Sequence, residues 1–241
     1  MMELTEKRMV SLLWMLRNKE KKWSILELQK GTSAMLGTKD SGVYRKGTRF
    51  PISGAALAYS PTLSFVKDLE KNGFVHKDSN TREYGVSKAA DLIRFMSLAR
   101  PFGSLTSLSY YSATGFSATL GKIKEIAGNK LPYAFTLFSG SELYRQYVKT
   151  GNVHVYIRQE QLKEWEKALL PGKFLKAEKN NANLFLIPVA RQNAIFLQSA
   201  KIKGYSVAPL PILISDLLSF GGLAEEQGSF LLDKWLNKEI N

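Results

Sequence analysis

Cysteine is absent from the 241-residue sequence. Its absence excludes a disulfide framework, a cysteine-based zinc site and a thiol nucleophile. No apolar run approaches the roughly 18 residues that a membrane-spanning helix needs. Near the start of the chain, acidic residues precede the apolar positions and no small-residue cleavage site follows. We therefore expect a helix of the folded protein there, not a signal peptide, and a cytoplasmic protein with no membrane partner.

Acidic residues are scarce relative to basic ones. The chain has 34 Lys and Arg against 21 Asp and Glu, which gives a formal net charge of +13. Residues 1–100 hold 18 basic and 10 acidic residues, a net charge of +8, and the remaining 141 residues hold 16 and 11, a net charge of +5. This excess favours a polyanionic partner such as nucleic acid, although a solvated lysine surface would explain the charge equally well.

The N-terminal region is predicted to begin with two helices. Apolar residues recur at near-helical spacing over residues 3–17. Residues 24–31 are predicted to form a second, short helix, with Ser24 as its N-cap, Glu27 completing a capping box and Gly31 as its end.

Residues 31–59 differ in composition from their surroundings. They are rich in glycine, serine and threonine, as is typical of an exposed insertion. The insertion carries Lys39, Arg45, Lys46 and Arg49. These cations either add contacts to DNA or belong to a solvated loop, and the composition leaves both alternatives open.

A third helix followed by a charged hairpin is the most informative pattern. The helix is predicted to begin at Ser60-Pro61 and to end at Asn72-Gly73. The segments FVHK and REYGV then form two short strands around a polar tip at 78–81, and Ser87 caps a helix over 88–99. Three helices, a hairpin and a helix is the order of a winged helix-turn-helix domain, whose third helix enters the major groove.

The predicted third helix and hairpin supply the groups that DNA binding requires. Small hydroxyl side chains at the helix start can reach base edges, while cations on the helix and hairpin can contact phosphates. The predicted contacts are Ser60, Thr62, Ser64, Lys67, Lys71, Lys77 and Arg82, together with Arg45, Lys46 and Arg49.

The passage SFVKDLEKNGFV resembles the recognition-helix-to-wing segment of prokaryotic winged-helix regulators, but the 31–59 insertion departs from the minimal pattern. We expect double-stranded DNA as the partner. Because operators are usually palindromic, we also expect a homodimer or cooperative binding to repeated half-sites. The alternative is a small α+β domain that uses its hairpin to contact another protein.

The second half is predicted to be a mixed α/β domain at 105–241. A linker over 100–107 joins it to the predicted DNA-binding domain at 1–100. The fold class expected for the whole chain is therefore α+β. The expected elements, in order, are a helical pair at 107–128, a strand at 133–140, a helix at 141–149, a strand at 153–157, a helix at 160–170 with Leu162, Trp165, Leu169 and Leu170 inward, strands at 183–190, 194–202 and 204–210, and two helices broken at Phe220-Gly221-Gly222.

Residues 210–236, LPILISDLLSFGGLAEEQGSFLLDKWL, resemble the C-terminal passage of the AbiEi family, the regulator-type antitoxins of type IV toxin–antitoxin systems. In that family an Asp-Leu-Leu helix is followed by a glycine turn and a closing helix rich in alanine and glutamate. The segments 183–197 and 205–210 resemble its strand–turn–strand passage. The resemblance implies a cytoplasmic repressor that autoregulates its operon. It also implies a functional link, without a stable complex, to a nucleotidyltransferase-like toxin.

The same resemblance implies a reduced nucleotidyltransferase fold for the C-terminal domain. An active enzyme of that fold needs a Gly-Ser turn and a following strand with Asp-x-Asp, which holds Mg²⁺. Here Ser139-Gly140-Ser141 precedes the strand VHVYI, which carries no carboxylate. We therefore expect no catalysis, no metal and no cofactor.

Two other functions remain open at the level of the sequence. One is a ligand-responsive transcription factor with a pocket near Tyr110-Tyr111. The other is a nucleotide-acting enzyme that uses the winged helix for targeting. The chain contains no phosphate-binding glycine loop, His-Glu-x-x-His or Gly-x-Ser-x-Gly motif. The two histidines, His76 and His154, have no partner pattern, so we expect no catalytic role for either.

Overall fold

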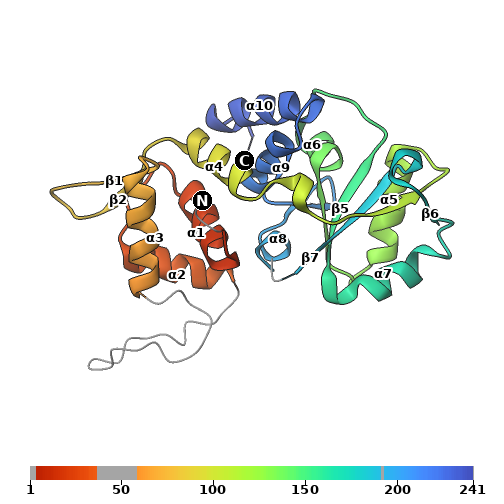
Figure 1. Cartoon of the computed structure of the whole chain (residues 1–241), viewed down its shortest axis with the longest axis horizontal. Helices are drawn as coiled ribbons and strands as arrows, with labels where there is room; N and C mark the ends of the chain where they lie inside the picture. Colours follow the sequence, from red (N-terminus) through yellow and green to blue (C-terminus); the bar gives the residue numbers. More distant parts are fainter. Residues whose placement is uncertain (1–3, 37–58, 191–192, 241) are drawn as a thin grey trace. The chain divides into compact units, whose positions relative to one another are not determined.

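The computed structural model describes residues 4–36, 59–190 and 193–240. The chain divides into two compact units, Met1–Ala99 and Arg100–Asn241, which we call unit 1 and unit 2 (Figure 1). Both units combine helices with strands, so the expected mixed α+β class is confirmed. In the part of the chain that the structure describes, no helix is both long enough and apolar enough to cross a membrane.

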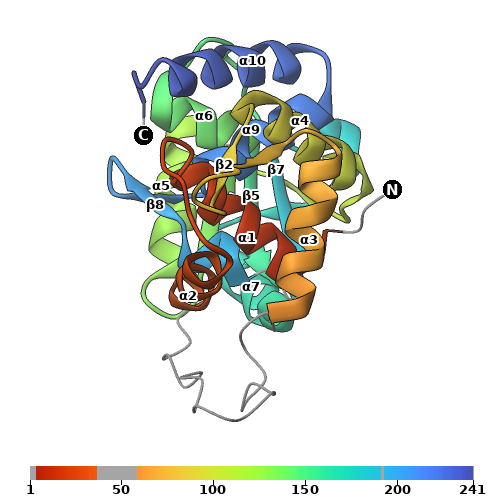
Figure 2. The same cartoon turned by 90° about the vertical axis from the view of Figure 1, so that its left-hand side faces the viewer.

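Unit 1 contains helices around a two-stranded antiparallel hairpin. Figure 2 shows α3 along one side of this unit, with α1 and α2 beside it. The elements are α1 (Glu6–Arg17), α2 (Ile25–Met35), α3 (Tyr59–Lys71), β1 (Val75–Lys77), β2 (Tyr84–Val86) and α4 (Ala89–Ala99). The side chains buried between them include Leu12, Met15, Leu28, Phe65, Leu69 and Leu92.

The start of α2 is as predicted and its end is not. The Ser24 hydroxyl accepts from the Glu27 N–H at 3.2 Å, and the Glu27 carboxylate accepts from the Ser24 N–H at 2.7 Å. This is a complete capping box, and it lowers the pKa of Glu27. The helix then continues past Gly31 to Met35, so the expectation that Gly31 ends it is wrong.

Gly31 has a packing role instead. A Cβ atom placed on Gly31 would lie 1.7 Å from the indole Nε1 of Trp14 on α1. Only a residue without a side chain leaves room for this indole, so Gly31 sets how closely α1 and α2 approach. Glycine at position 31 therefore reflects a steric requirement of packing and not the end of a helix.

The connection between α1 and α2 is paired with the hairpin. Trp23 and Tyr84 exchange two backbone hydrogen bonds, of 2.9 and 2.8 Å, and form an antiparallel bridge. Their rings stack with centroids 5.6 Å apart, and both side chains are buried. The base of the hairpin is thereby fixed to the helices.

Unit 2 is built on a mixed sheet with strand order β6-β3-β7-β5-β4-β9-β8 among the described residues. β5 runs parallel to β7 and antiparallel to β4. The strands are β3 (Leu108–Tyr111), β4 (Tyr133–Thr136), β5 (Val153–Arg158), β6 (Leu175–Lys176), β7 (Leu184–Val189), β8 (Ala200–Ile202) and β9 (Tyr205–Val207).

The helices of unit 2 form two groups. α5 contacts α7, whereas α6, α9 and α10 contact one another, and Figure 1 shows the groups at different sides of the sheet. Their bounds are η1 (Phe102–Ser104), α5 (Phe116–Ala127), α6 (Leu137–Arg145), α7 (Leu162–Leu169), α8 (Asn193–Leu197), α9 (Leu210–Phe220) and α10 (Leu223–Leu236). The break at Gly221-Gly222 is as predicted, with φ of +83° and +58°.

Four expectations for unit 2 need correction. Residues 108–111 form a strand and not a helix, because they pair with β7 and β6. The strand predicted to reach residue 140 stops at Thr136, where α6 begins. Part of the strand predicted at 194–202 is the helix α8. Leu170, predicted to be inward, is 72% exposed because α7 ends before it.

The segment 100–107 is not a free linker, because its first residues belong to the interior of unit 2. The Arg100 guanidinium donates to the Asp216 carboxylate at 2.5 Å and to the Tyr156 hydroxyl at 2.6 Å. Asp216 is fully buried and also accepts from Tyr156 at 2.7 Å and from Thr136 at 2.6 Å. Burial disfavours the charge on Arg100, but Tyr156 and Asp216 outweigh it and raise its pKa. Phe102, two residues on, is also buried.

We expect Gly31→Ala to destabilise unit 1 by about 1–3 kcal/mol, because the added methyl group must displace the Trp14 ring. The matched control is Gly121→Ala in α5, where a Cβ meets nothing within 4 Å. That change should stabilise unit 2 by about 0.5–1 kcal/mol through helix propensity alone. Urea unfolding followed by tryptophan fluorescence measures both. Equal effects of the two substitutions would contradict the steric role of Gly31.

Candidate nucleic-acid interface

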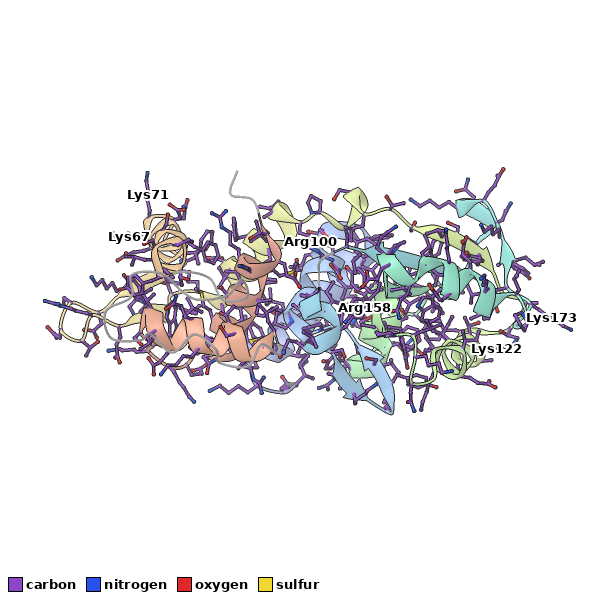
Figure 3. The ribbon with its side chains drawn as sticks, turned by 90° about the horizontal axis from the view of Figure 1, so that it is seen from below. Lys67, Lys71, Arg100, Lys122, Arg158 and Lys173 are labelled. Atoms are coloured by element: carbon purple, nitrogen blue, oxygen red, sulfur yellow. The ribbon has the colours of Figure 1, made fainter. Side chains whose placement is uncertain are left out.

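The exposed side of α3 carries a single polar stripe. Ser60, Ser64, Lys67 and Lys71 are spaced by four, three and four residues, so they lie on one face of the helix, and all four are exposed. The opposite face buries Phe65, Val66 and Leu69 in the interior of unit 1. Figure 3 shows Lys67 and Lys71 on the outer side of α3. We call these four residues the α3 stripe.

The two lysines of the stripe are available to a partner. Among the described residues, no ion pair involves Lys67 or Lys71. Asp68 and Glu70 lie on the same helix, but each is turned to one side of the stripe and is partly buried. The acids therefore flank the cations and do not interrupt them.

Two residues at the start of α3 differ from expectation. Thr62 is fully buried, so the prediction that it contacts bases is wrong. Its position, two residues from Ser60 and two from Ser64, turns it about 200° away from the stripe and into the interior. Ser60, where the helix was predicted to begin, lies within it, because Tyr59 is already helical.

The end of α3 determines where the hairpin begins. Gly73 has φ of +75°, and its N–H donates to the Glu70 carbonyl at 2.9 Å, while the Phe74 N–H donates to the Leu69 carbonyl at 3.0 Å. This is the left-handed helix end predicted at Asn72-Gly73. β1 therefore begins four residues after Lys71, the last residue of α3.

The hairpin presents the other two predicted cations. Lys77 and Arg82 are both exposed and lie on either side of the tip. Arg82 has φ of +59°, which is unusual for a residue with a side chain. The Lys77 ammonium lies 6.0 Å from the Tyr84 ring centroid. Figure 1 shows the hairpin projecting outward from the helices of unit 1.

Two residues that the sequence analysis did not single out organise the tip. The Asp78 carboxylate accepts from the Asn80 and Thr81 N–H groups at 2.8 and 3.1 Å, and it also accepts from the Lys22 ammonium. Asp78 at the start of a polar tip is a detectable turn signal. Lys22 gives no such signal, because it lies 56 residues earlier in the chain.

The predicted contacts Arg45, Lys46 and Arg49 lie outside the described residues, as does most of the 31–59 insertion. Of the predicted cations, the structure therefore describes Lys67 and Lys71 on α3 and Lys77 and Arg82 at the hairpin.

In unit 2, the Ser139-Gly140-Ser141 turn lies inside α6 and is buried. The Ser139 hydroxyl lies 2.7 Å from both the Thr136 and the His154 carbonyl oxygens, either of which can accept its one proton, and it accepts from the His154 N–H at 2.9 Å. A Cβ on Gly140 would lie 2.9 Å from Leu213 and 3.0 Å from the Phe135 carbonyl oxygen. Ser139 and Gly140 therefore join α6 to β4, β5 and α9.

His154 occupies the middle of this region as a neutral side chain. Its ring stacks on Phe185 with centroids 4.8 Å apart, and its Nδ1 has no hydrogen-bond partner among the residues that the structure describes. Burial, with a smaller effect of Lys179, lowers the pKa of His154 to about 3. His154 is the second residue of β5, whose first five residues are all buried. Tyr110, Trp165 and Trp235 are also buried, whereas Tyr111 is 45% exposed.

Comparison of the chain with protein-family models, curated proteins and solved structures found no significant match.

We expect unit 2 to lose stability in mild acid because of His154. A histidine whose folded pKa is about 3 and whose unfolded pKa is 6.5 contributes stability that is present above pH 6.5 and is lost as the pH falls below it. Between pH 7 and pH 5 the free energy of unfolding should fall by about 2 kcal/mol from this group.

Urea unfolding of His154→Phe, compared with the parent chain at both pH values, measures this contribution. The substitution should remove the decrease, whereas His76→Gln, which changes the exposed histidine, should retain it. The same acid sensitivity in the His154→Phe chain would contradict the assignment.

Proposed function

We propose that this chain is a double-stranded DNA-binding transcription regulator, in which unit 1 acts as a winged helix-turn-helix. α3 enters the major groove, and the β1–β2 hairpin contacts the adjacent phosphate backbone. The observation that carries this proposal is the α3 stripe. On the exposed face of one helix it combines two hydroxyl groups with two lysines that form no ion pair with another described residue. A hairpin bearing two further exposed cations follows directly.

The dimensions and chemistry suit this role. α3 has 13 residues and is therefore about 20 Å long, and a helix fits the roughly 12 Å width of the major groove. Ser60 and Ser64 can exchange hydrogen bonds with base edges, because a hydroxyl both donates and accepts. Lys67, Lys71, Lys77 and Arg82 supply charge to phosphates, which fixes register and adds affinity without sequence selectivity.

The Trp23–Tyr84 bridge supports the proposal from the packing side. A hairpin that contacts DNA beside a helix must keep a fixed distance from that helix. The two backbone hydrogen bonds and the ring stack hold β2 against the connection between α1 and α2. The neighbouring end of α3 is held by the Gly73 turn.

A narrower proposal is that the protein represses its own operon as an antitoxin of a type IV toxin–antitoxin system. Its support is the AbiEi-like passage at 210–236, which forms α9, the Gly221-Gly222 break and α10. The order of β4, the Ser139-Gly140-Ser141 helix and β5 also agrees with the strand–helix–strand unit that a reduced nucleotidyltransferase fold would contain. The proposal assigns no catalysis to unit 2.

The experiment that tests this function is a gel-shift titration of the full chain against the DNA immediately upstream of its own gene. It uses two salt concentrations and scrambled DNA as competitor. Specific binding that weakens with salt supports an autoregulating repressor. Weak binding of equal strength to both DNAs would contradict it.

We expect the triple variant Lys67→Gln, Lys71→Gln, Arg82→Gln to flatten the salt dependence of binding. Each lost phosphate contact should reduce the slope of log K against log salt by about 1, so the slope should change by about 2 to 3. The control is Lys163→Gln, Lys167→Gln, Lys130→Gln, which removes the same charge from exposed lysines of unit 2, two of them four residues apart as Lys67 and Lys71 are. An unchanged slope in the first variant would rule out the proposed interface.

We expect Ser60→Ala with Ser64→Ala to reduce selectivity and leave the salt slope unchanged. Loss of base-edge hydrogen bonds should lower the ratio of specific to scrambled affinity by about tenfold. Ser79→Ala, at the exposed hairpin tip, is the control for removal of a hydroxyl outside the stripe. If the Ser60→Ala, Ser64→Ala variant is as selective as the Ser79→Ala control, the two stripe serines do not contact base edges.

A further inference from the structure

The hairpin tip is organised around one acidic residue, Asp78. Its carboxylate accepts from the N–H groups of Asn80 and Thr81. Its backbone N–H donates to the Glu83 carbonyl at 2.8 Å, and its carbonyl accepts from the Arg82 N–H at 3.0 Å. Arg82 keeps its left-handed conformation within this set of bonds. The backbone of Arg82, from which its side chain extends, is therefore held by its hydrogen bond to Asp78.

Asp78 is tied to a distant part of the chain by Lys22. The Lys22 ammonium donates to the second carboxylate oxygen of Asp78, which the tip does not use. Lys22 lies next to Trp23, whose backbone pairs with Tyr84 at the base of the hairpin. The connection between α1 and α2 thus holds the hairpin at two levels, at its base and at its tip.

The pair is charged over the whole physiological pH range. The hydrogen bond from Lys22, together with those from Thr81 and Asn80, lowers the pKa of Asp78 to about 2. The same hydrogen bond raises the pKa of Lys22.

The ion pair also neutralises a carboxylate that lies next to Lys77 in the sequence and four residues before Arg82.

We propose that the Lys22–Asp78 pair is a positioning clamp for the DNA interface, which holds the hairpin tip in the conformation that directs Arg82 at a phosphate. This inference rests on the proposed function. It adds two positioning residues, neither of which needs to touch DNA. Without the clamp, the tip retains its turn but loses its fixed distance from the helices, so the Arg82 contact becomes weaker.

The decisive variant is Asp78→Asn, because the amide oxygen can still accept from Asn80 and Thr81 while the ion pair to Lys22 is lost. If only the net charge of the interface matters, Asp78→Asn should bind DNA more tightly, because it removes a negative charge. If the pair acts as a clamp, the variant should instead lose about tenfold in DNA affinity, which is comparable to the loss of one phosphate contact. The sign of the change therefore separates the two explanations.

Matched variants complete the design. Glu83→Gln removes a neighbouring negative charge without breaking the clamp, so it should bind as tightly as the parent chain or more tightly. Lys22→Gln should resemble Asp78→Asn, whereas Lys22→Arg, which keeps a cation, should retain parent affinity. Combining Asp78→Asn with Arg82→Gln should cost little more than Arg82→Gln alone, because both act through the same contact.

The readouts are gel-shift affinity and salt slope of the full chain on its upstream DNA, with urea unfolding to show that each variant folds. Weaker binding of Asp78→Asn and of Lys22→Gln, with parent-like binding of Lys22→Arg, supports the clamp. Parent-like or tighter binding of Asp78→Asn, together with an additive Arg82→Gln effect, would overturn it while leaving the proposed function intact. Absence of specific binding by the parent chain would overturn both.

Discussion

The geometry of unit 1 depends on the backbone pairing of Trp23 with Tyr84. A two-stranded hairpin has too little buried area to hold a fixed position by itself. Two hydrogen bonds and a stacked ring pair attach its second strand to the connection between α1 and α2. The first strand is attached to α3 through the Gly73 turn. With both strands fixed, the hairpin keeps a defined place next to the end of α3, which is the condition for the proposed contact of both elements with one stretch of DNA.

Unit 2 has its own central constraint in the buried carboxylate of Asp216. Three donors from separate segments, Arg100, Thr136 and Tyr156, satisfy its two oxygens. Removing one partner of such a buried pair typically costs about 3–5 kcal/mol, because the remaining charge is left without compensation. The network therefore fixes α9 against β4 and β5. It also fixes the point at which the chain enters unit 2.

Local signals in the sequence were reliable where the physics is local. The capping box at Ser24 and Glu27, the left-handed helix end at Gly73 and the glycine break at 221–222 each depend on neighbouring residues, and each is present. The predictions failed where contacts with residues far away in the sequence determine the local structure. Gly31 leaves room for the Trp14 ring and does not end a helix. Residues 108–111 became a strand because β7 and β6 lie beside them. Arg100 was assigned to a linker because Asp216, its partner, is 116 residues away.

The sequence by itself determined the order of elements in unit 1, the excess of basic residues and the helical spacing that places Ser60, Ser64, Lys67 and Lys71 on one face. Each of these is a property of composition or of short-range periodicity. The same spacing turns Thr62 away from that face, and only the tertiary structure decided that the side it faces is fully buried, because other helices cover it. It alone also brought Lys22 to Asp78, because contacts between residues so far apart in the chain arise from packing, which no local pattern encodes.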